Sequence, residues 1–219
     1  MNTSIFRLLS LFLVVTFSAV LSAETAASID SIKVTEQISF YRVSSSRGNT
    51  TSVVFAGEDG ALLVDPNFNE THVLLKQQIT ADHNSTIRYI TSTHAHRDHI
   101  EQYGQFADQA IVIIPENQSE DVSSWGGKPN VTYNDQLTLH LNEKKITLMT
   151  LPVKIGHTNG DELVHFVDDN VLYVGDYYFS RGYPIIDMNV GDLYGYIKNI
   201  NFIAESFPAD TIIIPGHTT

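Results

Sequence analysis

The chain has 219 residues, a formal net charge of −12 at pH 7 and no cysteine. Its 13 basic side chains form no cluster, which argues against a nucleic-acid substrate because phosphate backbones are bound by grouped Lys and Arg. The lack of cysteine excludes disulfide bonds and thiolate metal ligands, so the core alone must stabilise the fold. The length suits one domain with a sizeable core.

The start of the chain has the pattern of a secretory signal. Arg7 gives a short positive region, residues 8–20 are apolar, and Ala23 ends a stretch suited to cleavage. The apolar run is shorter than the roughly 20 residues that a membrane-spanning helix needs. We therefore expect a signal peptide over residues 1–23, one domain over residues 24–219, and a periplasmic or secreted protein without stable membrane insertion. An uncleaved membrane anchor is the alternative.

The first half of the predicted domain consists mainly of strands. A Gly-Glu-Asp-Gly turn at residues 57–60 indicates a hairpin, and helical spacing of apolar residues indicates a helix over 69–80. A short helix over 100–106 should follow the polar segment after the fifth strand. The predicted strands are 32–38, 40–43, 52–56, 61–64, 87–91 and 110–114.

The second half repeats this organisation. Residues 116–130, with the only tryptophan, are predicted to be a loop, either functional or a surface loop with one packed aromatic ring. A helix is predicted over 193–207. The predicted strands are 131–133, 136–141, 145–151, 163–167, 171–174 and 211–214. Two similar sets of strands and helices favour an α/β domain with sheets at the centre and helices outside.

A group of potential metal ligands follows the predicted strand at 87–91. Residues two apart in an extended loop point to the same side, so His94, His96 and Asp98 can converge. His99 then points toward a second position. Imidazole and carboxylate together suit zinc and related transition metals. A polar loop that happens to be rich in histidine is the alternative. Three further candidates each follow a strand-like run, namely His157, Asp176 and His217.

The order of these residues resembles that of the metallo-β-lactamase superfamily: His-x-His-x-Asp-His, a single His, a Gly-Asp and a terminal Gly-His. The resemblance runs from about Ser52 to the end of the chain. It implies a four-layer αββα sandwich with the site at the sheet edge, and two divalent metal ions, with zinc favoured. The implied ligands are His94, His96 and His157 for one ion, Asp98, His99 and His217 for the other, and Asp176 between them.

The resemblance also implies roles in catalysis. A hydroxide bridging the two ions would be the nucleophile, and Asp98 would orient it and accept or pass on its proton. Asp65, which ends a strand beside the metal loop, would hold a ligand in place. A turn role for Asp65 before Pro66 is the alternative. Candidates for lining the substrate cleft, with packing as the alternative, are Tyr177, Tyr178, Arg181 and Tyr183.

These features predict an exported hydrolase of a small-molecule ester, lactone or thioester, because a bridging Asp176 resembles the sites of lactonases and glyoxalase II-like enzymes. The alternative is a β-lactamase of the class that lacks both cysteine and the bridging aspartate. An iron-dependent redox protein and a non-catalytic metal binder are alternatives from other classes. Relatives normally continue beyond the last Gly-His, so a chain ending at Thr219 is expected to be a fragment or to have a reduced final layer. The oligomeric state is left open.

Overall fold

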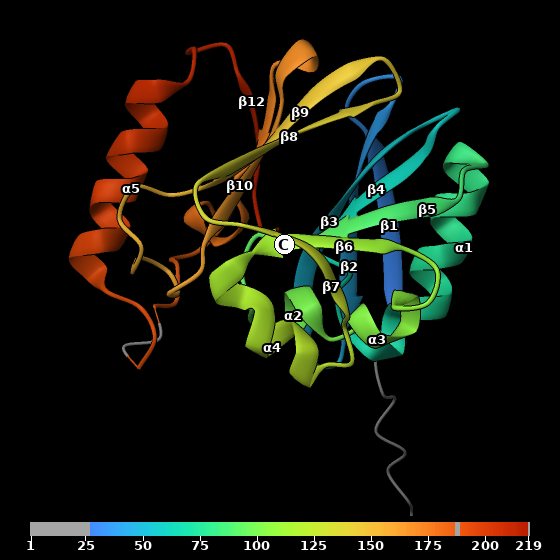
Figure 1. Ribbon diagram of the computed structural model, residues 1–219, viewed down its shortest axis with the longest axis horizontal. Coiled ribbons are helices and arrows are strands. Elements are labelled where there is room, and N and C mark those ends of the chain that lie inside the picture. The colour runs from blue at the N-terminus through green and yellow to red at the C-terminus, as the bar shows by residue number, and fades with distance from the viewer. Residues whose placement is uncertain (1–26, 187–188, 219) are drawn as a thin grey trace, which may run out of the picture.

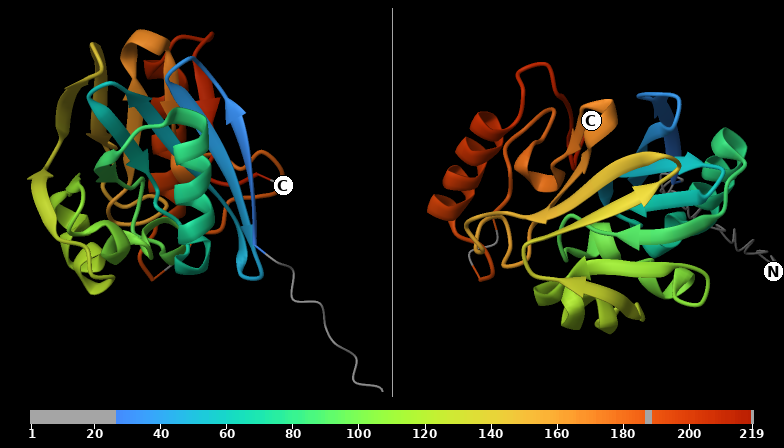
Figure 2. Two further views of the ribbon diagram at one scale, coloured as in Figure 1. Left: turned by 90° about the vertical axis from the view of Figure 1, so that its right-hand side faces the viewer. Right: turned by 45° about the horizontal axis from the view of Figure 1, so that its top comes forward.

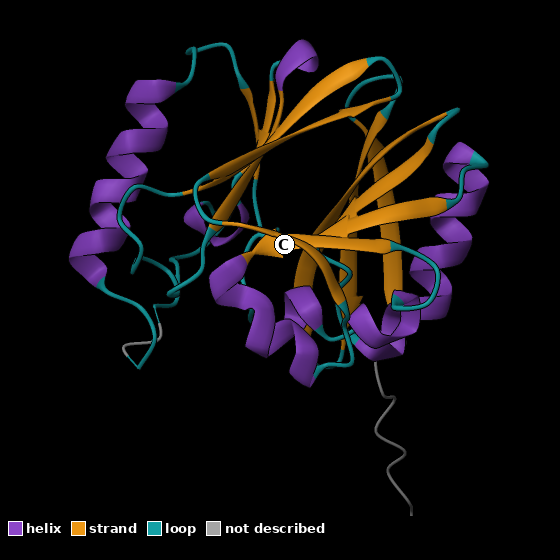
Figure 3. Ribbon diagram, viewed as in Figure 1, coloured by secondary structure: helices purple, strands orange, loops and turns teal. Residues whose placement is uncertain are grey.

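In the computed structural model, which describes residues 27–186 and 189–218, two β-sheets pack face to face (Figure 1). Helices cover the outer face of each sheet (Figure 3). The predicted αββα sandwich is thereby confirmed. The predicted signal segment lies outside the described residues. None of the helices in the described ranges has the length and apolar character needed to cross a membrane.

The larger sheet has seven strands in chain order. They are β1 (Ser28–Lys33), β2 (Ile38–Ser45), β3 (Gly48–Gly57), β4 (Gly60–Val64), β5 (Ile87–Thr91), β6 (Ile111–Pro115) and β7 (Pro129–Tyr133). Strands β1 to β4 are antiparallel, whereas β4 to β7 are parallel neighbours. Parallel strands need crossover connections. The helices in those connections are α1 (His72–His83), α2 (Arg97–Ile100), α3 (Tyr103–Phe106) and α4 (Ser119–Ser124).

The smaller sheet has five strands in the order β12-β11-β10-β9-β8. They are β8 (Gln136–Leu141), β9 (Lys144–Thr150), β10 (Glu162–Phe166), β11 (Val171–Tyr173) and β12 (Ile212–Ile214). Strands β11 and β12 are parallel, and the connection between them contains α5 (Leu193–Ser206). Figure 2 shows α5 on one side of the sandwich and the helices of the first half on the other.

Three layers of apolar side chains hold the sandwich together. Between the sheets, the rings of Phe55 and Phe166 stack with their centroids 5.7 Å apart. Leu75 and Ile79 of α1 pack on the outer face of the larger sheet, and Tyr196 of α5 packs on the smaller one. The central strands are therefore buried on both faces, which explains why they are continuous apolar runs rather than alternating patterns.

Several element boundaries differ from the prediction. The predicted strand over 32–38 instead covers the end of β1, a bend over residues 34–37 and the first residue of β2. Thr35 stabilises the bend, because its Oγ1 accepts the backbone N–H groups of Gln37 and Ile38. The predicted helix over 69–80 begins as a 3-10 turn and continues to His83, where left-handed Asn84 ends it. The predicted helix over 100–106 is the pair α2 and α3.

The predicted loop over 116–130 contains a 3-10 turn (Glu116–Gln118), helix α4 and the start of β7. Helix α4 has six residues and buries only Val122. Such a short helix has too few apolar positions to show a helical period. Trp125 lies at its end, with the guanidinium carbon of Arg97 5.2 Å from the centre of its ring.

A buried carboxyl group joins the two sheets. Glu162 of β10 is 1% exposed and accepts hydrogen bonds from the Tyr133 hydroxyl at 2.5 Å and the Thr91 hydroxyl at 2.9 Å. Burial raises the pKa of Glu162 well above its ordinary value of 4.5, and the two hydrogen bonds offset only part of this increase. The folded protein thus keeps a proton on Glu162 that the unfolded chain releases above about pH 4.5.

Folding stability is therefore expected to fall as the pH rises from 4.5 toward the higher pKa of the folded state. Glu162→Gln keeps the shape of the side chain and cannot ionise, so it should remove this part of the pH dependence and raise stability at pH 8 relative to wild type. Thermal unfolding at pH 5 and pH 8 measures both effects. Exposed Glu120→Gln is the control, and equal pH slopes in wild type and Glu162→Gln would contradict the prediction.

Candidate metal centre

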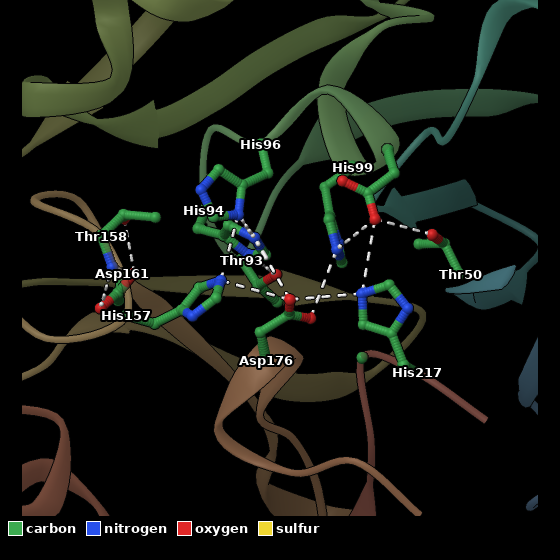
Figure 4. A network of polar contacts seen from close by, with 12 residues as sticks. Thr50, Thr93, His94, His96, His99, His157, Thr158, Asp161, Asp176 and His217 are labelled. Atoms are coloured by element: carbon green, nitrogen blue, oxygen red, sulfur yellow. Dashed lines mark hydrogen bonds and ion pairs between the residues drawn. The ribbon is translucent and has the colours of Figure 1, made fainter. Parts of the chain in front are cut away.

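All seven predicted ligands lie in two adjacent groups, and all of them except Asp98 are labelled in Figure 4. The His-x-His-x-Asp-His segment follows β5 and ends inside α2, which carries Asp98 and His99, and His157 lies in the loop between β9 and β10. Asp176 lies in a 3-10 turn (Gly175–Tyr177) after β11, and His217 follows β12. Each ligand thus follows the end of a strand, and both sheets contribute to the site.

The first group consists of His94, His96, His157 and Asp176. The Nδ1 atom of His96 is 3.0 Å from His94 Nε2 and 3.1 Å from His157 Nε2. Asp176 Oδ2 is 3.2 Å from His157 Nε2 and 3.7 Å from His94 Nε2. Three imidazole nitrogens and one carboxylate oxygen therefore converge on one point, which is a donor set that suits zinc.

The second group consists of Asp98, His99 and His217. Asp98 Oδ2 is 3.6 Å from His99 Nε2 and 3.4 Å from His217 Nε2. Asp176 reaches this group as well, with Oδ1 at 3.4 Å from His99 Nε2 and Oδ2 at 3.2 Å from His217 Nε2. The carboxylate of Asp176 therefore contacts imidazoles of both groups.

The protonation of the imidazoles fits metal binding. His99 Nδ1 is 2.8 Å from the Asp65 carboxylate and His217 Nδ1 contacts the carbonyl oxygen of Asn49, so the neutral form of each ring carries its proton on Nδ1 and leaves Nε2 free for a metal ion. His99 Nε2 and Asp176 Oδ1 are buried without a hydrogen-bond partner. Buried polar atoms without partners are costly, and a metal ion between the two groups would satisfy them.

Burial and neighbouring charges shift the pKa values of the ligand side chains in both directions. Burial lowers the pKa of His94 well below its usual range and that of His96 to about 4, so both rings are neutral and can ligate. Burial also acts on Asp176, but the charge of His99 and the contacts from His157 and His217 outweigh it and hold the pKa of this carboxyl well below its usual range. Burial also acts on His99 and His217, but Asp65 and Asp98 outweigh it at His99 and Asp176 outweighs it at His217, so the pKa values of both rings are raised. A metal ion in the second group would therefore have to displace the protons that the neighbouring carboxylates hold on these rings.

Asp65 holds the segment from Thr93 to His99 in place through hydrogen bonds. It is fully buried and has a positive φ of 57°. Its carboxylate accepts from the Thr93 backbone N–H at 2.7 Å, the Thr93 hydroxyl at 2.9 Å, the Tyr173 hydroxyl at 2.6 Å and His99 Nδ1. Asp65 thus contacts both the backbone before His94 and the ring of His99, and its positive φ also fits a turn before Pro66.

Sequence reasoning missed the groups that hold His157 and Asp176. The hydroxyl of Tyr177 accepts from the His157 backbone N–H at 3.1 Å and donates to Asp161 Oδ2 at 2.6 Å. Tyr196 of α5 stacks on Tyr177 and donates to the Asp176 carbonyl oxygen at 2.9 Å. These partners lie up to 20 residues apart in the sequence and match no local motif, so no sequence signal identifies them.

The glycines of the Gly-Asp and Gly-His pairs have a steric reason. Gly175 has a φ of 52°, and a Cβ atom there would collide with the Thr93 side chain. A Cβ atom at Gly216 would collide with the carboxylate of Asp176 and the backbone of Gly175. The strand ends that carry Asp176 and His217 therefore approach each other more closely than any other residue type allows.

A cleft of about 280 Å³ opens onto the ligands. The other side chains around it include Arg47, Phe68, Phe179 and Ile185. The predicted lining residues lie elsewhere: Tyr177 is buried, Tyr178 borders a separate apolar cavity beside α5, and Arg181 and Tyr183 are exposed outside the cleft.

This difference from the prediction follows from the backbone. Tyr178 is extended, so adjacent side chains point to opposite sides, and Phe179 rather than Tyr178 faces the site. The Phe179 ring stacks on the His217 ring, with the centroids 4.7 Å apart and an interplanar angle of 13°. Phe179 therefore both lines the cleft and packs against a ligand.

An αββα sandwich with two adjacent groups of His and Asp at its strand ends defines a metal-binding protein of the metallo-hydrolase type. Residues 46–217 match the family model described as the metallo-beta-lactamase superfamily, and the chain belongs to this superfamily.

Two curated relatives are similar in sequence. The hydroxyacylglutathione hydrolase of Bartonella henselae is 29% identical over 141 residues, which cover 61% of this chain and 50% of the relative. A metal-dependent hydrolase of Halobacterium salinarum is 33% identical over 101 residues, which cover 46% of this chain and 38% of the relative. The chain thus spans half or less of the length of these two relatives.

Solved structures share the fold. The metallo-beta-lactamase of Pontibacter korlensis superposes with a TM-score of 0.74 at 16% identity, covering 86% of this chain and 91% of the other. The metallo-beta-lactamase of Hirschia baltica has a TM-score of 0.69 at 20% identity, covering 87% and 91%. At these identities the likeness concerns the architecture.

Proposed function

We propose that this protein is a hydrolase that uses two divalent metal ions, with zinc favoured, to cleave a small ester, lactone or thioester. The observation that carries the proposal is the position of Asp176, whose carboxylate lies within 3.2–3.7 Å of imidazole nitrogens from both groups. A single negative side chain shared by two groups suits a pair of cations, because it offsets their mutual repulsion.

The two ligand groups, Asp176 and Asp98 would have different roles in the reaction. Each of the two groups would hold one ion, and Asp176 would contact both. When bound, two such ions lower the pKa of water to about 7 and polarise the carbonyl oxygen of a substrate. Asp98 lines the cleft, and the Thr50 hydroxyl fixes its Oδ2 atom at 3.0 Å. Asp98 is therefore placed to accept a proton at the site of attack.

The walls of the cleft favour an uncharged acyl compound. Phe68, Phe179 and Ile185 present apolar surface to it. Among the described lining residues, Arg47 is the only Arg or Lys, and Glu70 and Glu101 already bind its guanidinium group at 3.2 Å and 2.9 Å. A carboxylate on the substrate would have to compete with both. We therefore favour neutral esters and lactones over anionic thioesters and β-lactams.

Metal analysis combined with a substrate panel tests the proposal. Zinc-reconstituted protein should hold close to two ions per chain and hydrolyse 4-nitrophenyl acetate or a simple lactone faster than an anionic thioester or nitrocefin. A chelator should abolish turnover, and added zinc should restore it. One iron per chain with oxygen consumption would support a redox protein, bound metal without turnover a non-catalytic binder, and preferential nitrocefin hydrolysis a β-lactamase.

We also propose that residues 1–23 direct export to the periplasm or medium. The support is their composition: a short positive start, an apolar run and a small-residue end. Exported protein should begin at or near Glu24 when its N-terminus is sequenced. An intact N-terminus on protein recovered outside the cytoplasm would instead support the uncleaved anchor.

A further inference from the structure

We propose that Glu101 and Arg47 form a latch that positions the second group of ligands, Asp98, His99 and His217. The inference rests on the proposed two-ion site and assigns to these two residues a positioning role. Neither residue belongs to the ligand set, and the sequence pattern of the superfamily gave no reason to select them.

The first part of the latch is the tip of the hairpin formed by β2 and β3. The turn contains Arg47, and β3 begins directly after it at Gly48. The carbonyl oxygen of Asn49 accepts from His217 Nδ1, and the Thr50 hydroxyl donates to Asp98 Oδ2 at 3.0 Å. Two consecutive residues of the hairpin thus orient two of the three ligands in the second group.

The second part is Glu101, which directly follows the helix that carries Asp98 and His99. The Glu101 side chain is 4% exposed, and its Oε2 is 2.9 Å from Arg47 Nη2. Its Oε1 accepts from Arg47 Nη1 at 3.3 Å and from Arg97 Nη2 at 2.9 Å. The backbone N–H of Asn69 donates to Oε2 at 3.0 Å. A buried carboxylate with these partners is rigidly held.

The position of Arg47 is fixed on its other face as well. Its guanidinium carbon lies 4.3 Å from the centre of the Phe68 ring. The double contact between Arg47 and Glu101 is charge-assisted and is shielded from water on the side of the buried Glu101, so it is stronger than an ion pair between two exposed side chains. The hairpin tip is thereby joined to the helix that supplies Asp98 and His99, which sets the distance from Asn49 and Thr50 to their ligands.

The first group is held by different residues. Thr93 contacts His94 Nδ1 at 3.1 Å, and Tyr177 holds the backbone of His157. Neither contact involves the hairpin tip. Loosening the latch should therefore weaken binding of the second ion and leave the first nearly unchanged, which a general loss of folding stability would not do.

Glu101→Gln tests the latch, because it keeps the size of the side chain and removes its charge. Zinc titration against a competing chelator should show a loss of about tenfold or more in affinity for the second ion. Affinity for the first ion should change less than twofold. Glu70→Gln is the matched control, since Glu70 contacts the same guanidinium at 3.2 Å from a half-exposed position and does not hold the helix.

Arg47→Ala removes the other half of the latch from a half-exposed position, so the fold should survive even if Glu101→Gln proves unstable. It should lower the affinity for the second ion by a similar factor. The affinity in the double variant should be no lower than in the single variants, because both substitutions break the same contact. Unchanged second-ion affinity in Arg47→Ala and Glu101→Gln would overturn the latch.

A second readout does not depend on the ions. In metal-free wild type, the Nδ1 proton of His217 should be protected from solvent exchange in NMR spectra, and Glu101→Gln or Arg47→Ala should reduce that protection. If wild type binds only one ion, the two-ion proposal fails. The exchange protection of the His217 Nδ1 proton then tests the positioning role of Glu101 and Arg47 on its own. Equal protection in wild type and both variants would refute the latch.

Discussion

Asp176→Asn is expected to lower hydrolysis at least about 100-fold and to reduce metal content from two ions toward one. Asparagine keeps the shape of the side chain but supplies no charge to balance two cations. The first group would keep three imidazoles. The second would keep His99, His217 and Asp98 without the carboxylate whose two oxygens contact these histidines at 3.4 Å and 3.2 Å. Asp176→Ala should be at least as damaging.

Elemental analysis and turnover on the best substrate of the panel measure this effect. Asp169→Asn is the control, because it removes another largely buried carboxylate, paired with Lys144, that is not part of the cluster. The fold should survive in all variants, as circular dichroism would show. Two bound ions and undiminished β-lactam hydrolysis in Asp176→Ser would instead favour a β-lactamase that does not need this carboxylate.

Asp65→Asn is expected to have the second-largest effect, a loss of roughly 10–100-fold in affinity for the second ion. The carboxylate accepts a hydrogen bond from the Nδ1–H group of His99, which keeps Nε2 of the neutral ring free to ligate. An amide nitrogen in the place of Oδ2 would oppose that N–H and favour the other tautomer of His99, with the proton on the ligand atom. The amide would also face the hydroxyls of Thr93 and Tyr173.

Stability should fall by roughly 1–3 kcal/mol, since buried donors lose their acceptor. Asn tolerates the positive φ of 57°, so strain does not complicate the comparison. Zinc titration and thermal unfolding measure the two effects. Tyr173→Phe is the control, because it removes one donor to the same carboxylate but leaves the His99 contact intact. Normal second-ion affinity in Asp65→Asn would show that Asp65 does not set the tautomer.

The parts of the molecule that sequence reasoning predicted depend on local order along the chain. The apolar runs predicted the central strands because these strands are buried on both faces. His94, His96, Asp98 and His99 come together because they are close in sequence. His157, Asp176 and His217 join them because each lies in a segment that follows a strand of the smaller sheet at the same edge.

What the sequence could not predict depends on contacts between distant segments. The side on which Phe179 and Tyr178 point is set by the extended backbone after Asp176, which no periodicity reveals. The pairing of Arg47 with Glu101 joins residues 54 positions apart. Helix α4 was missed because a six-residue polar helix has no apolar period. Contacts of this kind between distant residues can be seen only in the folded structure.

The origin of the ligands in both sheets has a consequence for folding. An ion held by His94, His96 and His157 would tie the loop after β5 in the larger sheet to the loop after β9 in the smaller one, 61 residues along the chain. Such an ion binds the native chain and not the unfolded one, so it shifts the folding equilibrium by about 4 kcal/mol when its free concentration is 1,000 times the dissociation constant. The ion would act as a reversible crosslink between the two halves of the sandwich. In a chain that has no cysteine to join them covalently, metal supply during folding would set how firmly those halves are held together.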